Sequence, residues 1–263
     1  GRGGPRQIRA ESCLLRPYNM ETGAAPFDSL QVADIGDVAI NTFNLQKTIP
    51  IIEQAYDEIL SHGCKPLTLG GDHPIVFPIR AAMKKKYGPL ALVHVDAHAD
   101  VNDTMFGEKI AHGTPFRRCV EAGLLHGPSV FQIGLRGTGY TAEDFDWPRA
   151  QGFTVVTAQE CWHKSLAPLM ERVRRTIGDR PCYLSFDIDG LDPSCAPGTG
   201  TPEYGGLSVI QGYEIVRGCA GLNLVGCDLV EISPPYDPFG NTALLGANLL
   251  YEMLCVLPGV THR

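Results

Sequence analysis

Seven short apolar runs recur along the chain, and most of them have no polar residue at alternate positions. They cover residues 32–35, 66–69, 90–95, 129–133, 154–157, 182–186 and 224–230. A strand of this kind is covered on both faces, as the strands of a parallel sheet are. Helical patterns occupy residues 45–61, 75–87, 164–178 and 208–219, and Ser208 is expected to cap the last of them. The alternation predicts strand–helix–strand units around one mainly parallel sheet, an α/β fold.

The chain is expected to form a single domain over residues 1–263. Its 263 residues fit one large α/β domain better than two ordinary ones, and no linker divides them. Residues 190–206, rich in Gly and Pro, form the longest apparent loop, and long loops in compact domains are usually functional. The most apolar tract, residues 242–260, contains Asn248 and Glu252 and is predicted to be a packed helix rather than a membrane span.

Charge and cysteine usage limit the possible partners and the compartment. A formal net charge of -7 disfavours binding to nucleic acid and to anionic membranes, which leaves small solutes. The nine cysteines are spread singly without a CxxC pair, which is typical of reduced thiols and not of disulfides or structural zinc. The opening residues lack an apolar signal region. We therefore expect a cytoplasmic protein.

Metal-binding side chains follow three of the predicted strands. The clusters are Gly70-Gly71-Asp72-His73, Asp96-Ala97-His98-Ala99-Asp100 and Asp187-Ile188-Asp189-Gly190. Ligands of open α/β sheets bind at the carboxyl ends of the strands, so the three clusters should converge. Alternate residues of an extended segment point to one side, which would let Asp96, His98 and Asp100 face a common point. The sequence therefore predicts one shared site.

The donor atoms of this site indicate two metal ions. Four carboxylates and two imidazoles are available, from His73, Asp96, His98, Asp100, Asp187 and Asp189. An oxygen-rich set suits Mn²⁺, and it is too large for one catalytic ion that keeps an open position. Two divalent ions, four carboxylates and a hydroxide leave a net charge of about -1, which favours a cationic substrate.

Simpler interpretations apply to single residues. One Asp at a strand end is usually a turn former, and His94, alone in an apolar run, is expected to be a hydrogen-bonded core residue. Histidines without a partner pattern are assigned to structure or surface: His62, His126, His163 and His262. A purely structural role does not explain the six donors taken together, because buried unpaired carboxylates are costly.

Six motifs in this order resemble those of the ureohydrolase family, which comprises arginases, agmatinases and related guanidino-acid hydrolases. They are GGDH (70–73), DAHAD (96–100), HG (112–113), SFDIDGLDP (185–193), GTGTPEYGGL (198–207) and DLVEISPPYD (228–237). The resemblance implies a three-layer α/β/α fold, two Mn²⁺ per subunit, and hydrolysis of a guanidinium group to an amine and urea. It also implies a homotrimer or homohexamer.

The resemblance assigns the metal ligands and the catalytic groups. The first manganese would be held by His73, Asp96, Asp100 and Asp187, and the second by Asp96, His98, Asp187 and Asp189. Asp96 and Asp187 would bridge the ions, whose shared hydroxide would be the nucleophile. His112 matches the proton shuttle and Glu231 the carboxylate that holds the guanidinium, while Asp189 would also stabilise the intermediate. Thr201 would line the same site.

The segment before the proton shuttle bears on the substrate. Residues 102–118 and Tyr140 look more like the guanidinobutyrase, guanidinopropionase and agmatinase branch than like arginase. Met105 could pack along a methylene chain, and Asn102 or Tyr140 could bind a terminal carboxylate or merely stabilise the loop. We expect 4-guanidinobutyrate as the substrate, with agmatine and 3-guanidinopropionate as alternatives. Two other classes are a metal-dependent deacetylase, which a single zinc per chain would indicate, and a catalytically silent metal-binding family member.

Two departures from the family pattern stand out. Pro74 replaces the usual Ser or Thr after His73, where it is expected to favour an extended His73 and to remove a local hydrogen bond. Residues 1–5 resemble the interior of the family's opening segment, and the first strand of the family fold is missing. We therefore expect either a trimmed chain or a sheet that is one strand short.

Overall fold

A six-stranded parallel sheet forms the centre of the computed structural model, which describes residues 2–141 and 144–263. In spatial order β1-β6-β5-β2-β3-β4, its strands are β1 (Leu67–Leu69), β6 (Leu224–Val230), β5 (Cys182–Asp187), β2 (Leu90–Val95), β3 (Leu125–Leu135) and β4 (Thr154–Thr157). Each neighbouring pair is parallel. The predicted parallel sheet is confirmed, with β3 longer than its apolar run.

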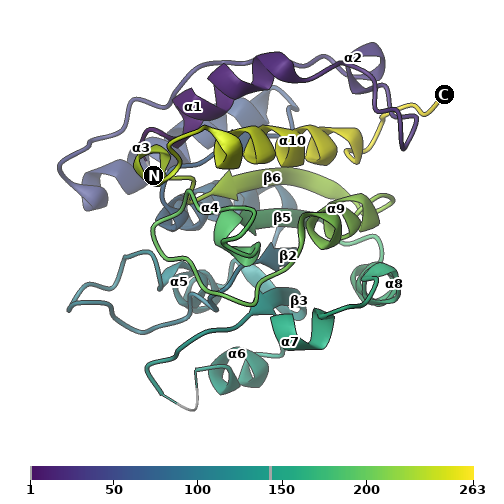
Figure 1. Ribbon diagram of the computed structural model, residues 1–263. Coiled ribbons are helices and arrows are strands. Elements are labelled where there is room, and N and C mark those ends of the chain that lie inside the picture. Colours follow the sequence, from purple (N-terminus) through teal and green to yellow (C-terminus); the bar gives the residue numbers. More distant parts are fainter. Residues whose placement is uncertain (1, 142–143) are drawn as a thin grey trace.

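Helices cover both faces of this sheet. The α-helices are α1 (Gly4–Glu11), α2 (Pro26–Ser29), α3 (Leu45–Ser61), α4 (Val76–Tyr87), α5 (Pro115–Glu121), α6 (Asp146–Ala150), α7 (Ala158–Cys161), α8 (Ala167–Ile177), α9 (Val209–Gly218) and α10 (Asn241–Cys255). Short 3-10 turns are η1 (Ser12–Leu14), η2 (His73–Ile75), η3 (Ile188–Gly190) and η4 (Pro234–Tyr236). On one face α1, α10, α9 and α8 pack in succession, and α3, α4 and α5 pack on the other (Figure 1). The three-layer α/β/α fold is confirmed.

Alternation along β2 divides the core between the two faces. Ala91, Val93 and Val95 join the cluster that lies under α8, α9 and α10. Leu90 and Leu92 join the cluster under α3, α4 and α5. Each of these five side chains is fully buried. A strand buried on both sides needs apolar residues at every position, which explains the continuous run in the sequence.

Side-chain caps fix the start of two predicted helices. Asn44 accepts a hydrogen bond from the backbone N–H of Lys47 and starts α3. Ser208, the expected cap, forms a capping box with Gln211 and starts α9. The apolar tract 242–260 supplies α10, which packs against α1 and α9. No helix among residues 2–141 and 144–263 is long and apolar enough to span a membrane.

Residues 32–35 do not form a strand, so that prediction is wrong. Residues 31–40 have neither helix nor strand assignment, and Val32 and Ile35 are 45% and 72% exposed. A strand needs a hydrogen-bonded neighbour, and β1 pairs only with β6 among the described residues. The segment is held instead by Arg9 of α1, whose guanidinium contacts Asp34 and Asp37 at 2.7 and 2.6 Å.

Candidate metal centre

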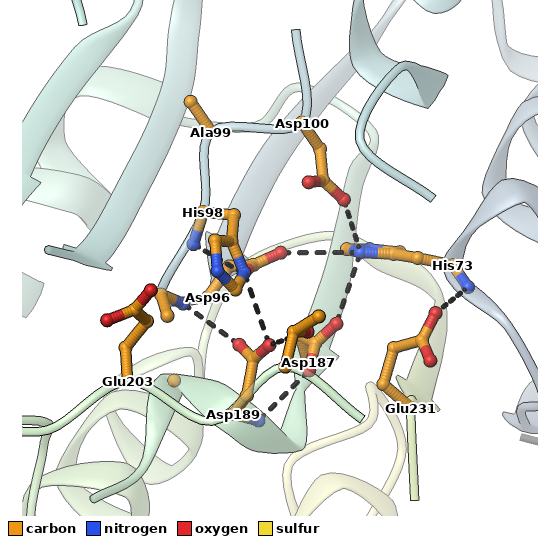
Figure 2. A network of polar contacts seen from close by, with 12 residues as sticks. His73, Asp96, His98, Ala99, Asp100, Asp187, Asp189, Glu203 and Glu231 are labelled. Carbon is orange, nitrogen blue, oxygen red and sulfur yellow. Dashed lines mark hydrogen bonds and ion pairs between the residues drawn. The ribbon is translucent and has the colours of Figure 1, made fainter. Parts of the chain in front are cut away.

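Three strands of the sheet, β1, β5 and β2, bring the predicted donors to one edge. Asp96 directly follows β2, and Asp187 ends β5, the neighbour of β2 in the sheet. His73 opens η2 shortly after β1, which lies beyond β6. In Figure 2 the carboxylates of Asp96, Asp100 and Asp187 point toward the ring of His73. The three clusters therefore converge at the carboxyl ends of the strands, as the sequence predicts.

Three carboxylates surround one nitrogen of His73. Its Nδ1 atom lies 2.8 Å from Asp100 Oδ2 and 3.3 Å from both Asp96 Oδ2 and Asp187 Oδ2. These contacts lie away from the direction of a hydrogen bond, so the buried Nδ1 atom has no hydrogen-bond partner. An imidazole nitrogen that faces three oxygens without hydrogen bonding to them has the arrangement of a metal ligand.

His98 completes a second group of donors beside the first. Its Nδ1 atom lies 3.2 Å from Asp189 Oδ2 and 3.4 Å from Asp96 Oδ1. Asp96 therefore uses one oxygen toward His73 and the other toward His98, as a carboxylate shared by two ions would. The backbone holds these carboxylates in place, since Ala97 N–H donates to Asp189 at 3.1 Å and Asp189 N–H to Asp187 at 2.9 Å.

Burial and mutual repulsion shift the pKa values of this cluster. Burial, then the charges of Asp189 and Asp96, raises the pKa of Asp187 well above its usual range. Burial, then the charge of Asp96, raises the pKa of Asp100 to about 6. For His73, burial alone lowers the pKa, but contacts with three carboxylates outweigh it and hold the pKa well above the ordinary value. The cluster therefore retains protons unless cations replace them.

The donor set fits two divalent cations. All four carboxylates are buried, and so is His73, while the side chain of His98 is 32% exposed. Several buried carboxylates within one site require positive charge nearby. The ligand atoms of Asp96, His98 and Asp189 lie within 4.8 Å of one another, a spacing that one ion can span. Oxygen donors predominate and thiolates are absent from the six donors, which suits Mn²⁺ or a similar hard cation.

His112 and Glu231 lie together at the rim of these donors. Nδ1 of His112 is 2.6 Å from Glu231 Oε1, and the imidazole side chain is 58% exposed. The hydrogen bond that the imidazole donates to Glu231 raises the pKa of His112, against a smaller lowering by burial. Glu231 is itself buried and also accepts the backbone N–H of His73 at 2.6 Å (Figure 2). A half-exposed imidazole that keeps its proton can donate it to a leaving group.

Unusual backbone geometry aims two of the acids. Asp100 and Glu231 have φ values of 54° and 62°, in the left-handed region that residues other than glycine rarely adopt. Asp100 therefore reaches His73 through a turn, and not through the extended segment that the spacing predicts. Pro74 also differs from expectation, because His73 starts a 3-10 turn and the residue before it, Asp72, is the extended one. Proline fits the first turn of a helix, so it leaves the ligand in place.

The predicted substrate residues differ in where they lie. Thr201 lies at the donors, where its hydroxyl donates to Asp189 Oδ2 at 3.2 Å. The side chain of Asn102 donates to the Gly113 carbonyl at 3.0 Å and so closes the loop before the proton shuttle. Met105 packs against Gly113. Tyr140 is 72% exposed, and within the described residues no hydrogen bond joins its side chain to the site.

The sequence alone does not identify two further contributors. Arg136, just after β3, donates six hydrogen bonds, all of them to backbone carbonyls of Gly134, Asp189, Gly190, Leu191 and Glu203. It thereby holds the start of the 190–206 loop against the sheet. His94 is the buried, hydrogen-bonded core residue that its apolar surroundings predict, but its Nε2 atom lies 2.8 Å from Asp96.

Comparisons with known proteins agree with this site. The sequence pattern of the arginase family matches residues 1–255. A guanidinobutyrase from Pseudomonas aeruginosa is 72% identical over 100% of this chain and 82% of its own length. A mitochondrial agmatinase from Gallus gallus is 62% identical over 98% of this chain and 76% of its own. The solved proclavaminate amidino hydrolase from Streptomyces clavuligerus has a TM-score of 0.90 at 36% identity, over 97% of this chain and 86% of that one. The resemblance stated from the motifs is confirmed, and the chain belongs to the arginase family.

Proposed function

We propose that this protein hydrolyses 4-guanidinobutyrate to 4-aminobutyrate and urea. The observation that carries the proposal is the 72% identity to a guanidinobutyrase over the whole chain. The reaction adds one water: the bond between the substituted nitrogen and the guanidinium carbon breaks, the carbon leaves as urea, and the nitrogen leaves as a protonated amine. Hydrolysis of agmatine is the second candidate, because the agmatinase relative is 62% identical.

The residues of the site have separate proposed roles in this reaction. Two divalent ions, when bound, supply Lewis-acid chemistry and lower the pKa of a coordinated water. The six donors His73, Asp96, His98, Asp100, Asp187 and Asp189 would hold them. Glu231 accepts N–H groups of the guanidinium and orients its carbon, since a carboxylate pairs with a guanidinium at two points. His112, beside Glu231, gives a proton to the departing amine nitrogen.

Two further residues complete the proposed substrate site. Thr201 orients Asp189 through its hydroxyl, and the carboxylate of Asp189 would stabilise the tetrahedral species that forms when water adds to the guanidinium carbon. Met105 lies against Gly113, next to the proton shuttle, where an apolar side chain can cover the methylene chain of the substrate. Asn102 and Tyr140 stay proposed contacts of the substrate carboxylate, with Asn102 also closing the loop.

Manganese, subunit assembly and compartment belong to the same proposal. Mn²⁺ is the proposed ion on the basis of the oxygen-rich donor set. A homotrimer or homohexamer is proposed from the family resemblance; the buried side chains of α10 pack within the chain, so the apolar tract does not itself require a partner. A cytoplasmic location is supported by the nine cysteines, all of which are free thiols.

Urea release from a substrate panel tests the proposal. The purified protein is stripped of metal and assayed with and without added Mn²⁺ against 4-guanidinobutyrate, 3-guanidinopropionate, agmatine and arginine. We expect Mn²⁺-dependent urea, with 4-guanidinobutyrate giving the highest kcat/KM. A preference for agmatine of more than about tenfold in kcat/KM, roughly 1.4 kcal/mol in transition-state binding, would assign the second candidate. A folded, metal-loaded protein that releases no urea would be a silent member of the family.

A further inference from the structure

A row of polar residues crosses the sheet just before the strand ends that carry the metal donors. In β2 and β5 it lies two residues before Asp96 and Asp187. The strand registers pair Thr68 with Asp228, Asp228 with Ser185, Ser185 with His94, and His94 with Gln132. This polar row therefore spans five of the six strands, on the face covered by α3, α4 and α5. Asp228, Ser185, His94 and Gln132 have no solvent exposure. Polar groups in the middle of a core are costly unless they are hydrogen-bonded, so the partners of this row need to be identified.

One arm of the polar row ends on Asp96. Gln132 donates from Nε2 to the carbonyl of Ala99 at 2.8 Å, and this contact fixes which end of the amide is the nitrogen. The same Nε2 lies 3.0 Å from Nδ1 of His94, which must then accept the hydrogen bond. The proton of His94 therefore lies on Nε2, which donates to Asp96 Oδ2 at 2.8 Å. Because both ring nitrogens are engaged, His94 has no lone pair left for a metal.

The other arm ends on His73. Ser185 donates its hydroxyl hydrogen to Asp228 Oδ1 at 2.7 Å, so its oxygen can only accept from elsewhere. That oxygen lies 3.4 Å from Nε2 of His73, which places the imidazole proton on Nε2. Once a cation replaces the proton, Nδ1 would be the free nitrogen, and it is the one that faces the three carboxylates. Asp228 makes no direct contact with the six donors, yet it sets the tautomer of one of them.

We infer that the polar row is a positioning layer for the metal centre, and this inference rests on the two-metal site of the proposed function. Gln132 and His94 fix the orientation of Asp96, the carboxylate shared between both groups of donors. Asp228 and Ser185 fix the tautomer of His73. Partners of this kind raise the affinity of a site for its ion by holding each ligand in the form that binds. These four residues act through the ligands and touch no substrate.

Affinity for Mn²⁺ tests the inference without using activity. Equilibrium dialysis followed by elemental analysis gives the number of ions per chain and their Kd, and circular dichroism and the Tm of the metal-free protein report folding. The variants are His94→Leu, Gln132→Leu, Ser185→Ala and His94→Gln, since the amide nitrogen of glutamine can take the place of Nε2. The matched control is Ser129→Ala, which removes a buried hydroxyl that contacts His126 at 3.0 Å on the same strand as Gln132, away from the donors.

We expect the Leu and Ala variants at the polar row to weaken Mn²⁺ binding about 10- to 100-fold while the protein stays folded. His94→Gln should return the Kd toward the wild-type value, and the Ser129→Ala control should leave it unchanged. If His94→Leu fails to fold, Gln132→Leu and Ser185→Ala decide the question, because they remove hydrogen bonds of the polar row and leave His94 in place.

Three outcomes would overturn the inference. Wild-type Kd values in folded Gln132→Leu and Ser185→Ala would mean that the polar row serves stability alone. An equal loss of affinity in the Ser129→Ala control would mean that any buried hydrogen bond has this effect. A wild-type protein that binds no divalent ion would remove the metal centre itself. The first outcome leaves the proposed function intact if the variants still release urea, so the two failures can be told apart.

Discussion

Oε1 of Glu231 lies 2.6 Å from Nδ1 of His112 and accepts, at the same distance, the backbone N–H of His73. One carboxylate oxygen thus joins the proposed proton donor to the turn that carries a metal donor. Glu231 directly follows β6 and makes both contacts from a left-handed backbone conformation, with a φ of 62°. The two halves of the site, one that binds ions and one that moves a proton, are held in fixed relation by this atom.

Glu231→Gln should lower activity and move its pH dependence. The contact with Glu231 is the main cause of the raised pKa of His112, so the amide should bring that pKa back down. A general acid works only while protonated, so the alkaline fall in kcat should begin at a lower pH in the variant. We also expect kcat/KM to fall about 100-fold or more, because a neutral amide no longer pairs with the guanidinium charge. A pH profile with an unmoved alkaline limb would contradict the assignment.

His112→Asn should remove proton transfer and spare metal binding. General acid catalysis typically contributes about 10²- to 10⁴-fold, so kcat should fall within that range. His112 contacts Glu231 and none of the six donors, so the Kd for Mn²⁺ should stay at the wild-type value. The control is His126→Asn, at a partly buried histidine whose described partner is Ser129. Loss of metal from His112→Asn would show that the imidazole is a ligand instead.

Much of this site could be predicted from the sequence because of one spacing rule. Donors two residues apart after a buried strand are expected on one side, and this spacing predicts that Asp96, His98 and Asp100 meet, although a left-handed φ brings Asp100 in. The same spacing, continued one step back into the strand, reaches His94, and from Asp187 it reaches Ser185. The sequence does not mark these two as part of the site, because a polar residue inside an apolar run usually belongs to the core. The structure gives them partners in the site as well.

Other features depend on partners that a local pattern cannot supply. The apolar run at residues 32–35 has strand-like composition, but composition cannot tell whether a neighbouring strand exists. Arg136 makes its six hydrogen bonds to backbone carbonyls, which every residue has, so no residue type marks its partners. The turn at Asp100 follows from a positive φ, which the sequence around an aspartate only weakly favours.

The metal-free protein should lose stability as the pH rises. Burial and the charge of Asp96 raise the pKa of folded Asp100 to about 6, from 3.8. A carboxyl with a raised pKa favours folding below its unfolded pKa, and that contribution is lost as the pH rises through about 6. The pKa of His98 is lowered by burial but raised by Asp189 and then Asp96, to about 12, and acts in the same direction above 6.5.

Thermal unfolding of the metal-free protein checks this sign. The Tm should fall by at least about 3 °C, the effect of roughly 1 kcal/mol in a chain of this size, between about pH 6.5 and about pH 8. Below pH 6.5 burial of His94, which lowers its pKa to about 4, acts in the opposite direction. Added Mn²⁺ should reverse the trend, because its binding releases the same protons and strengthens as the pH rises. Asp100→Asn should flatten the part of the curve near pH 6. A Tm that rises above about pH 6.5 in the metal-free wild type would be incompatible with the raised pKa values.

Gly190→Ala should displace Asp96, because the added methyl group would crowd the backbone of Asp96. A Cβ atom at Gly190 would lie 2.9 Å from Val95 Cγ1 and 3.0 Å from the backbone nitrogen of Asp96, both closer than ordinary contact. Overpacking of this kind typically costs about 1–3 kcal/mol, so we expect a lower Tm together with weaker Mn²⁺ binding. Gly200→Ala is the control, because no atom outside its neighbours lies within 4 Å of the new Cβ. Equal Tm values for the two variants would contradict the predicted crowding.

Arg136→Lys should loosen η3, which contains Asp189, and the 190–206 loop, which contains Thr201, without changing either residue. The guanidinium donates from three nitrogens to carbonyls on both sides of the loop, at 2.6 to 3.1 Å, and it pairs with no carboxylate among the described residues. An ammonium group donates from one point and cannot span them.

We expect Arg136→Lys to lower stability by about 2 kcal/mol, since hydrogen bonds from a charged donor are lost. kcat/KM should fall by up to about 100-fold, because a small displacement of catalytic groups has effects of that size. Arg149→Lys is the control, at an exposed arginine whose ion-pair partner is Asp146. Tm and urea release are measured for both variants. If Arg136→Lys kept full activity and stability, the six hydrogen bonds would not be what holds Asp189 at the metal donors.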